Sequence, residues 1–314
     1  MKIAILGASG HYPYVLDALP LIEGAEVTSV APTRPEEDIS RLLEKVKGAA
    51  VYASPEELLA RAEYDIVAVN GWFCDSADIS IACMKKGIPV YSEKPLATSL
   101  PKLSELSRTY GETKSPLGCM LDGPSRGWFR AVQRAVQAGE IGEIRMLHAQ
   151  KSYRMGTRGA VYRRIETYGG MLPWVGIHGV NWVCRLLQKP VLSFSAASSD
   201  AHNRGNGEME TAAALLLKFQ GGEIATVTAD FLRPVASARH DDDRLRVTGT
   251  KGMIEAIDGR VFLENDLPRR ELSVPEDINP FADFVRKLQT GETDADAREA
   301  IESTRICLSA RDAS

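Results

Sequence analysis

Short apolar runs alternate with amphipathic segments through the first third of the chain. Runs rich in Val, Ile and Ala, bounded by turn formers, lie at 2–7, 25–31, 49–52, 64–70 and 88–91. Helical patterns separate them, and the segment Ser54-Pro55-Glu56-Glu57 has the residues of a helix start. Buried strands that alternate with helices predict an α/β fold with a doubly wound parallel sheet, the Rossmann arrangement.

The pattern changes after residue 120. A predicted helix at 125–138 and a long strand at 144–153 are followed by grouped strand-like runs at 191–199, 211–219, 223–231, 245–248, 253–256 and 261–263. Grouped strands predict a C-terminal α+β domain with a large, mostly antiparallel open sheet and helices on one face. The last predicted helix covers 295–310. We therefore predict two domains, 1–120 and 121–314.

Composition narrows the class of protein. The 314 residues are 44% hydrophobic and 25% charged, which is ordinary for a soluble enzyme. The net charge of −4 gives no electrostatic reason to expect nucleic acid or an anionic membrane as a partner. Five dispersed cysteines without a C-x-x-C pair predict reduced thiols, a cytoplasmic location and no metal site. No apolar run approaches the roughly 18 residues of a membrane span, and we expect no signal peptide.

The first strand leads into a glycine turn with candidate cofactor-binding residues. The fit to G-x-G-x-x-G is partial, because Gly7 and Gly10 are present but Ser9 and Tyr12 replace the second and third glycines. We expect Pro13 to begin the helix and the amides of Ser9 to Tyr12, including that of His11, to face phosphate oxygens. A flavodoxin-like fold without a nucleotide is the alternative.

Two further strand ends contribute to the predicted cofactor site. The position that is acidic in NAD-specific proteins falls at Pro32, followed by Thr33 and Arg34, and this favours NADP over NAD. Glu36 and Glu37 are expected to open the next helix. Asn70 and Trp72 follow the strand at 64–70, where the nicotinamide half of a dinucleotide would lie.

The stretch Gly87–Ala97 places Glu93-Lys94-Pro95 just past a buried strand. An acid and a rigid imino acid there can hold the Lys94 ammonium beside a bound cofactor. The alternative is a helix entry, with Pro95 in the first turn.

A second chemical stretch runs from Gly169 to Trp182. A helix over 173–187 would bring Trp174, His178 and Asn181 onto neighbouring faces. His178 is a candidate general base, and a core or capping histidine is the alternative. Tyr153 and the nearby arginines are candidate substrate contacts, although arginines in a loop are by default a solvated surface.

The chain resembles the glucose-fructose oxidoreductase / inositol dehydrogenase / MocA family. The resemblance is carried by the glycine turn, by Glu93–Ala97 and by two glycine-containing runs, 138–144 and 247–252. His178 falls on the histidine of the family pattern G-G-x-L-x-D-x-G-x-H, but Trp174 replaces its aspartate, and Asn181 stands where another acid is common. Both departures are expected to remove negative charge from around the imidazole.

The resemblance implies an NAD(P)-dependent oxidoreductase that acts on a secondary alcohol or ketone of a sugar, cyclitol or related polyol. Lys94 and His178 are the predicted catalytic residues, and the family association implies a homodimer or homotetramer through the C-terminal sheet. Two alternatives stay open: a non-catalytic dinucleotide-binding sensor or regulatory protein, and a lyase or glycosidase that uses the cofactor transiently.

Overall fold

The computed structural model describes residues 1–314 and divides into two compact units. The first unit contains Met1–Met120, Glu166–Gly169 and Asn279–Thr304. The second contains Leu121–Ile165, Gly170–Ile278 and Arg305–Ser314.

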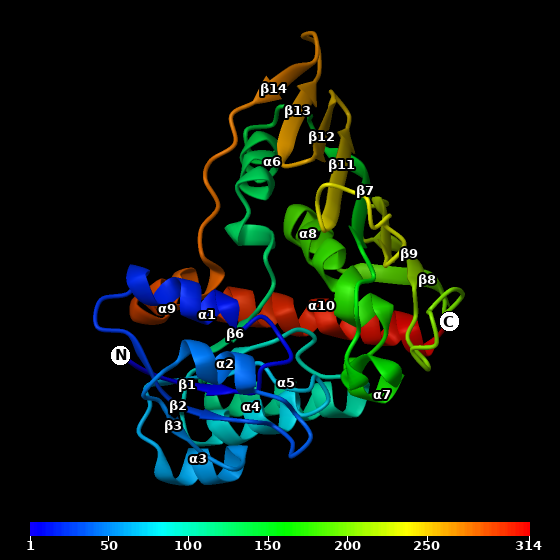
Figure 1. Ribbon diagram of the computed structural model, residues 1–314. Coiled ribbons are helices and arrows are strands. Elements are labelled where there is room, and N and C mark those ends of the chain that lie inside the picture. Colours follow the sequence, from blue (N-terminus) through cyan, green and yellow to red (C-terminus); the bar gives the residue numbers. More distant parts are fainter. The chain divides into compact units, whose positions relative to one another are not determined.

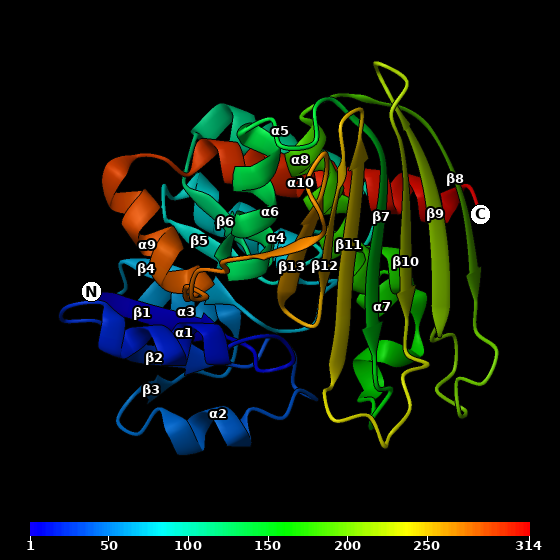
Figure 2. The same cartoon turned by 90° about the horizontal axis from the view of Figure 1, so that it is seen from above.

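The first unit is built on a six-stranded parallel sheet in the order β3-β2-β1-β4-β5-β6. Figure 1 labels β1, β2, β3 and β6 of this sheet, and Figure 2 labels all of its strands. Its strands are β1 (Lys2–Leu6), β2 (Glu26–Ala31), β3 (Ala50–Val51), β4 (Ile66–Val69), β5 (Val90–Ser92) and β6 (Leu117–Cys119). The helices between them are α1 (Pro13–Ala18), η1 (Leu19–Leu21), α2 (Ser40–Lys45), α3 (Pro55–Arg61), α4 (Ser76–Lys85) and α5 (Leu100–Thr113). The predicted doubly wound sheet is confirmed, as are the start of α1 at Pro13 and the Ser54 cap of α3, whose hydroxyl accepts from the Glu57 amide.

The core of this unit explains why a late segment belongs to it. Ile3 and Ile5 of β1 are fully buried, because both faces of a central parallel strand are covered by helices. Helix α9 (Pro280–Thr290) adds Phe281 and Phe284 to the same core. Residues 279–304 therefore group with the first unit, whereas the sequence placed them in the segment 121–314.

The second unit contains a mostly antiparallel eight-stranded sheet in the order β14-β13-β12-β11-β7-β10-β9-β8. Figure 2 shows seven of these strands, β13 to β8, side by side. Their bounds are β7 (Ile144–Tyr153), β8 (Val191–Ser199), β9 (Ala212–Phe219), β10 (Ile224–Asp230), β11 (Asp241–Gly249), β12 (Met253–Ile257), β13 (Arg260–Glu264) and β14 (Arg270–Leu272). The pair β7–β10 is parallel and the other neighbours are antiparallel, so the predicted sheet type is confirmed.

Helices cover one face of this sheet. Helix α8 (Ile177–Leu187) contacts β7 and β10, and α6 (Gly127–Gln137) contacts β12 and β13. The expected helix over 173–187 is instead a π-helical turn, Leu172–Gly176, followed by α8. The short elements η2 (Gly123–Ser125), η3 (Ala160–Arg163) and α7 (Ile165–Tyr168) complete the segments around it, and α10 (Asp294–Asp312) ends the chain.

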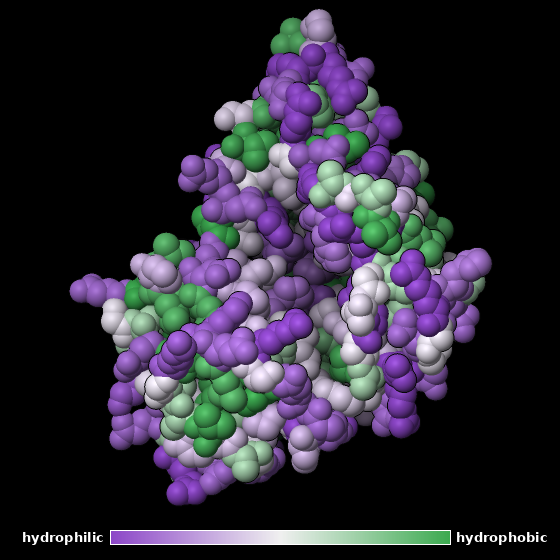
Figure 3. All heavy atoms as spheres, viewed as in Figure 1, coloured by the Kyte–Doolittle hydropathy of each residue, from purple (hydrophilic) through white to green (hydrophobic).

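The other face of the sheet is open and partly apolar. Met146, Leu216 and Ile224 on β7, β9 and β10 are 41%, 46% and 38% exposed, while Leu147, Leu217 and Ala225, which follow them, are buried. Hydrophobic spheres are visible near β8 and β9 in Figure 3. None of the helices is long and apolar enough to span a bilayer.

Candidate active site

The glycine turn after β1 requires glycine by conformation and by space. Gly7 has φ +81°, and a Cβ atom there would lie 2.1 Å from Cα of Gly71, which follows β4. The backbones of the two strand ends therefore lie so close together that only glycine fits at position 7. This is the strand–turn–helix geometry of dinucleotide-binding proteins.

The amides of the turn are bonded within the chain, which corrects the expectation that they are free. One carboxylate oxygen of Glu37 accepts from the amides of Ala8 (3.0 Å) and Ser9 (3.1 Å) and from the Ser9 hydroxyl. The other accepts from the amide and the hydroxyl of Thr33, each at 2.8 Å. Glu37 was expected to open a helix, but α2 begins at Ser40, and the Glu37 side chain is buried instead.

Glu93 satisfies the next part of the turn. Its buried carboxylate accepts from the His11 amide at 2.6 Å, contacts Nδ1 of His11 at 2.8 Å and accepts from the Lys94 amide at 3.0 Å. Burial raises the pKa of Glu93, but His11 and Lys94 outweigh it, so the pKa lies below its ordinary value. The amide of Gly10 donates to the Asn70 carbonyl at 2.8 Å. The amides of Gly7, Ser9, Gly10 and His11 thus each donate to an acceptor elsewhere in the chain, namely Ala31, Glu37, Asn70 and Glu93.

Lys94 is buried in the loop after β5, with 1% of its surface exposed. The Lys94–Pro95 peptide bond is cis. The alternative interpretation, a helix entry at Pro95, is wrong, because α5 begins only at Leu100.

Asn70 and Arg34 differ in their availability to a ligand. The side-chain amide of Asn70 is fully buried, and neither its nitrogen nor its oxygen has a hydrogen-bond partner. Arg34, the predicted ligand of a 2′-phosphate, binds Asp75 through two nitrogens at 2.6 and 2.8 Å and lies over the Trp72 ring at 5.0 Å. The charge of the guanidinium is thus paired with the Asp75 carboxylate through Nε and Nη2.

These residues fit a dinucleotide at the carboxyl edge of the first sheet. The orphaned Asn70 amide supplies a donor and an acceptor without partners, and Gly7 and Gly71 leave room for a close approach to the backbone. Glu37, five positions after Pro32, places a carboxylate against Ser9 and Thr33, near the end of β2.

In the second unit, His178 faces a carboxylate that the sequence prediction missed. Nδ1 of His178 lies 2.8 Å from Oδ1 of Asp122, and the two side chains are 4% and 5% exposed. The distance is that of a charge-assisted hydrogen bond between the imidazole and the carboxylate. Asp122 lies just beyond β6, so its position past a parallel strand was the available signal. It supplies the negative charge that Trp174 and Asn181 were expected to remove.

Two cations contact the Asp122 carboxylate, Lys151 and Arg126, and Nε of Arg126 lies 3.3 Å from it. Nζ of Lys151, on β7, lies 3.2 Å from Asp122. It lies 2.7 Å from Asp243, the residue opposite Lys151 on the neighbouring strand β11. Burial raises the pKa of Asp122, but Lys151 and His178 outweigh it and hold that pKa well below the ordinary range. Burial lowers the pKa of Lys151, but the charges around it, with that of Asp122 the largest, outweigh burial. The pKa of Lys151 therefore lies well above its ordinary value. Asp122 is therefore a carboxylate and Lys151 an ammonium at neutral pH.

The remaining predicted substrate residues surround this network. Trp174 is buried and meets the Tyr162 ring at 5.5 Å, edge to face. Asn181 is buried, and its oxygen accepts from Arg185 at 3.3 Å. Tyr153 lies at the end of β7, and the Lys151 ammonium is 5.6 Å from its ring.

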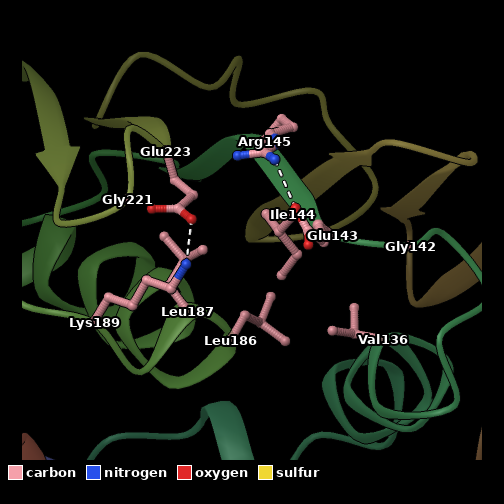
Figure 4. A pocket seen from close by; sticks show the side chains of 10 residues that line it. All are labelled: Val136, Gly142, Glu143, Ile144, Arg145, Leu186, Leu187, Lys189, Gly221 and Glu223. Carbon is pink, nitrogen blue, oxygen red and sulfur yellow. Dashed lines mark hydrogen bonds and ion pairs between the residues drawn. The ribbon is translucent and has the colours of Figure 1, made fainter.

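A separate cavity of about 490 Å³ in the second unit contains none of the predicted site residues. Figure 4 shows its charged side chains bonded in pairs, Arg145 with Glu143 at 2.6 Å and Lys189 with Glu223. Because these charges neutralise each other, we do not assign the cavity to the active site.

Two models of known protein families match the two parts of the sequence. Residues 1–119 match the model of the oxidoreductase family with an NAD-binding Rossmann fold, and residues 129–255 match the GFO/IDH/MocA C-terminal domain. A solved structure from Thermotoga maritima, which carries the provisional name of an oxidoreductase, is 34% identical and superposes with a TM-score of 0.95, covering 100% of this chain and 97% of that one.

The chain belongs to the GFO/IDH/MocA family. Its fold and its place among oxidoreductases with an NAD-binding domain are as predicted. The inositol 2-dehydrogenase of Azotobacter vinelandii is 30% identical over 139 residues, 43% of this chain and 40% of that protein. The myo-inositol 2-dehydrogenase of Thermotoga maritima is 25% identical over 259 residues, 82% of this chain and 75% of that protein. The alignment with the first of these relatives thus spans less than half of its length.

Proposed function

We propose that this protein is an NAD-dependent dehydrogenase that oxidises a secondary alcohol of a sugar, cyclitol or related polyol to a ketone. The observation that carries the proposal is the buried His178–Asp122 pair in a chain of this family. An imidazole beside a permanent carboxylate is suited to accept a proton from a hydroxyl group. The inositol dehydrogenases among its relatives support a polyol as the substrate.

In the proposed mechanism, His178 takes the hydroxyl proton and Asp122 stabilises the resulting imidazolium. Lys94 keeps its predicted role as a donor to the reacting oxygen and to the nicotinamide ribose. The nicotinamide, when bound, accepts the hydride from the substrate carbon. Tyr153, Trp174 and Asn181 are the proposed substrate contacts.

For the cofactor, we propose NAD rather than the NADP that the sequence favoured. The Glu37 carboxylate bonds to Ser9 and Thr33, where the turn meets the end of β2, and an acid at that place favours free ribose hydroxyls over a 2′-phosphate. The bidentate pair of Arg34 with Asp75 removes the cation on which the NADP preference rested.

Cofactor binding is tested by thermal unfolding with NAD, NADH, NADP and NADPH, because a ligand of the folded state adds RT ln(1 + [L]/Kd) to its stability. We expect the larger shift with NAD and NADH, and no change in the preference in Arg34→Ala. A preference for NADP that Arg34→Ala abolishes would restore the earlier prediction.

Catalysis is tested with Lys94→Ala and His178→Ala on a substrate found by screening polyols. Each substitution is expected to lower kcat by about 10²–10⁴ if the group acts in proton transfer. Lys102→Ala, whose side chain is 44% exposed, and His148→Ala, an exposed position, are the matched controls. Near-normal turnover in both test variants would refute the assignment, and tight NAD binding without turnover of any polyol or ketone would favour the sensor alternative.

Two other predictions stay predictions. We propose that the open face of the eight-stranded sheet pairs with a second copy in a homodimer or homotetramer, since it exposes Met146, Leu216 and Ile224. The cytoplasmic location rests on the dispersed cysteines alone.

A further inference from the structure

Arg158, in the segment after β7, is a partly buried cation without an acidic partner. Its guanidinium carbon lies 4.0 Å from the ring centre of Phe231 and 5.3 Å from that of Tyr162. Nε is buried without a hydrogen-bond partner, and Nη2 donates to the Arg154 carbonyl at 3.3 Å. Arg158 takes part in no ion pair. The aromatic rings and the Tyr162 hydroxyl thus orient a guanidinium whose Nε has no acceptor within the chain.

A second arginine makes this corner electropositive. Arg154 also has no ion pair, and its Nη1 donates to the Val235 carbonyl at 3.4 Å. The pKa of the nearby His240 is lowered by burial and by the charges of Arg158, Arg154 and Arg233, although Asp241 opposes them. Burial is the largest cause of this shift, and the arginines add to it because a nearby positive charge disfavours the protonated imidazole.

The acids of the facing strand β11 do not neutralise this corner. Asp241 lies 3.7 Å from Arg239. Asp242 is 3.1 Å from Arg233 and 3.0 Å from Arg244. Each of these acids has an arginine partner of its own, and neither forms an ion pair with Arg154 or Arg158.

The corner adjoins the His178–Asp122 network within the second unit. Because β7 and β10 are parallel, Tyr153 and Phe231 lie at the same edge of the sheet, with ring centres 6.4 Å apart. Tyr153 comes two residues after Lys151, which contacts Asp122. On the other side, Tyr162 meets Trp174, one helical turn before His178.

We propose that Arg158 binds a carboxylate of the substrate, so that the substrate is an acidic sugar or polyol such as an aldonate or a uronate. The inference rests on the proposed dehydrogenase function and narrows its substrate class. A planar guanidinium matches a carboxylate through two parallel hydrogen bonds. The rings of Tyr162 and Phe231 limit water around the pair and strengthen it.

The experiment compares matched acids, neutral sugars and phosphate esters with NAD-loaded protein. The probes are D-gluconate against sorbitol, D-glucuronate against D-glucose, and D-glucose 6-phosphate as the phosphate arm. Thermal stabilisation and kcat/KM are measured for the wild type, Arg158→Met and Arg158→Lys. Arg246→Met, an exposed arginine of β11, is the matched control.

We expect the acids to be preferred over their neutral counterparts. Arg158→Met should lower the acid-to-neutral ratio of kcat/KM by about 10- to 150-fold, the range for a hydrogen bond to a charged group. Arg158→Lys should keep part of the wild-type acid-to-neutral ratio. The control Arg246→Met should leave that ratio unchanged. Equal use of neutral sugars, an unchanged ratio in Arg158→Met, or a preference for the phosphate ester would overturn the proposal and leave the dehydrogenase function standing.

Failure of the proposed function gives a different result. In that case no probe drives NADH formation, while stabilisation by the acids that is lost in Arg158→Met would still support the anion site. Circular dichroism confirms that each variant is folded.

Discussion

Replacing Asp122 by Asn removes the charge that faces His178 while keeping the size of the side chain. In the wild type, Oδ1 of Asp122 lies 2.8 Å from Nδ1 of His178, and its other oxygen lies 3.2 Å from Nζ of Lys151. Both Asp122 and His178 are almost fully buried, so water screens their interaction little.

The size of the effect follows from this geometry. An opposite charge within about 4–6 Å shifts a pKa by about 1–3 units, and each unit corresponds to about 1.4 kcal/mol. The imidazolium of His178 should lose about 1.4–4 kcal/mol of stabilisation in Asp122→Asn. If proton transfer to His178 limits the reaction, kcat falls by about 10- to 1000-fold.

The assay is the pH dependence of kcat between pH 5 and 9. A carboxylate favours the protonated imidazole, so its removal lowers the pKa of His178. The limb of the profile that reports His178 should therefore move to lower pH by about 1–3 units. Asp258→Asn is the control, because Asp258 is 61% exposed and contacts only Arg239 at 3.5 Å. A folded Asp122→Asn protein with wild-type kcat and an unmoved limb would refute the role of this pair.

Three further substitutions test other parts of the structure. Glu37→Gln removes a negative charge from the cofactor turn, so the ratio of the Kd values for NADP and NAD, measured by titration, should shift toward NADP by about tenfold or more; an unchanged ratio contradicts the proposed NAD preference. Lys151→Met leaves the buried Asp243 carboxylate without its cation, and Asp122 with Arg126 and His178 alone, and should lower the free energy of unfolding in urea by about 3–5 kcal/mol; a loss below about 1 kcal/mol would show that the network is not needed for stability. Gly7→Ala places a Cβ atom against Gly71 and should abolish stabilisation by NAD, whereas Gly24→Ala, which has a positive φ but no neighbour within 4 Å, should keep it.

The architecture follows largely from the hydrophobic pattern. Strands β1 and β4 of the parallel sheet are buried almost throughout, whereas burial partly alternates along β7. The hydrophobic pattern of the sequence predicted all three strands. Strand β14 was not predicted, because three residues without an apolar run carry no signal. Helix α9 was also missed, although Asn279 caps it and Phe281, Phe284 and Val285 recur at helical spacing.

The site was predictable only where it depends on strand ends. Gly7, Asn70 and Lys94 follow β1, β4 and β5, and the carboxyl ends of parallel strands form one edge. Glu37 bonds to an amide 29 positions away and Asp122 contacts His178 through the folded chain, so neither partnership has a local signature. The missing family aspartate suggested a loss of charge, whereas the structure places a carboxylate at the imidazole from another loop.

We propose that this chain oxidises a polyol and reduces NAD to NADH. Incubation of the purified protein with NAD and a panel of sugars, cyclitols and their acids, with NADH followed by absorbance and the product identified by mass spectrometry, tests it most directly. We expect equimolar NADH and ketone from at least one member of the panel, and neither product from His178→Ala. Product formed without net NADH, or no product from protein that binds NAD, would contradict it.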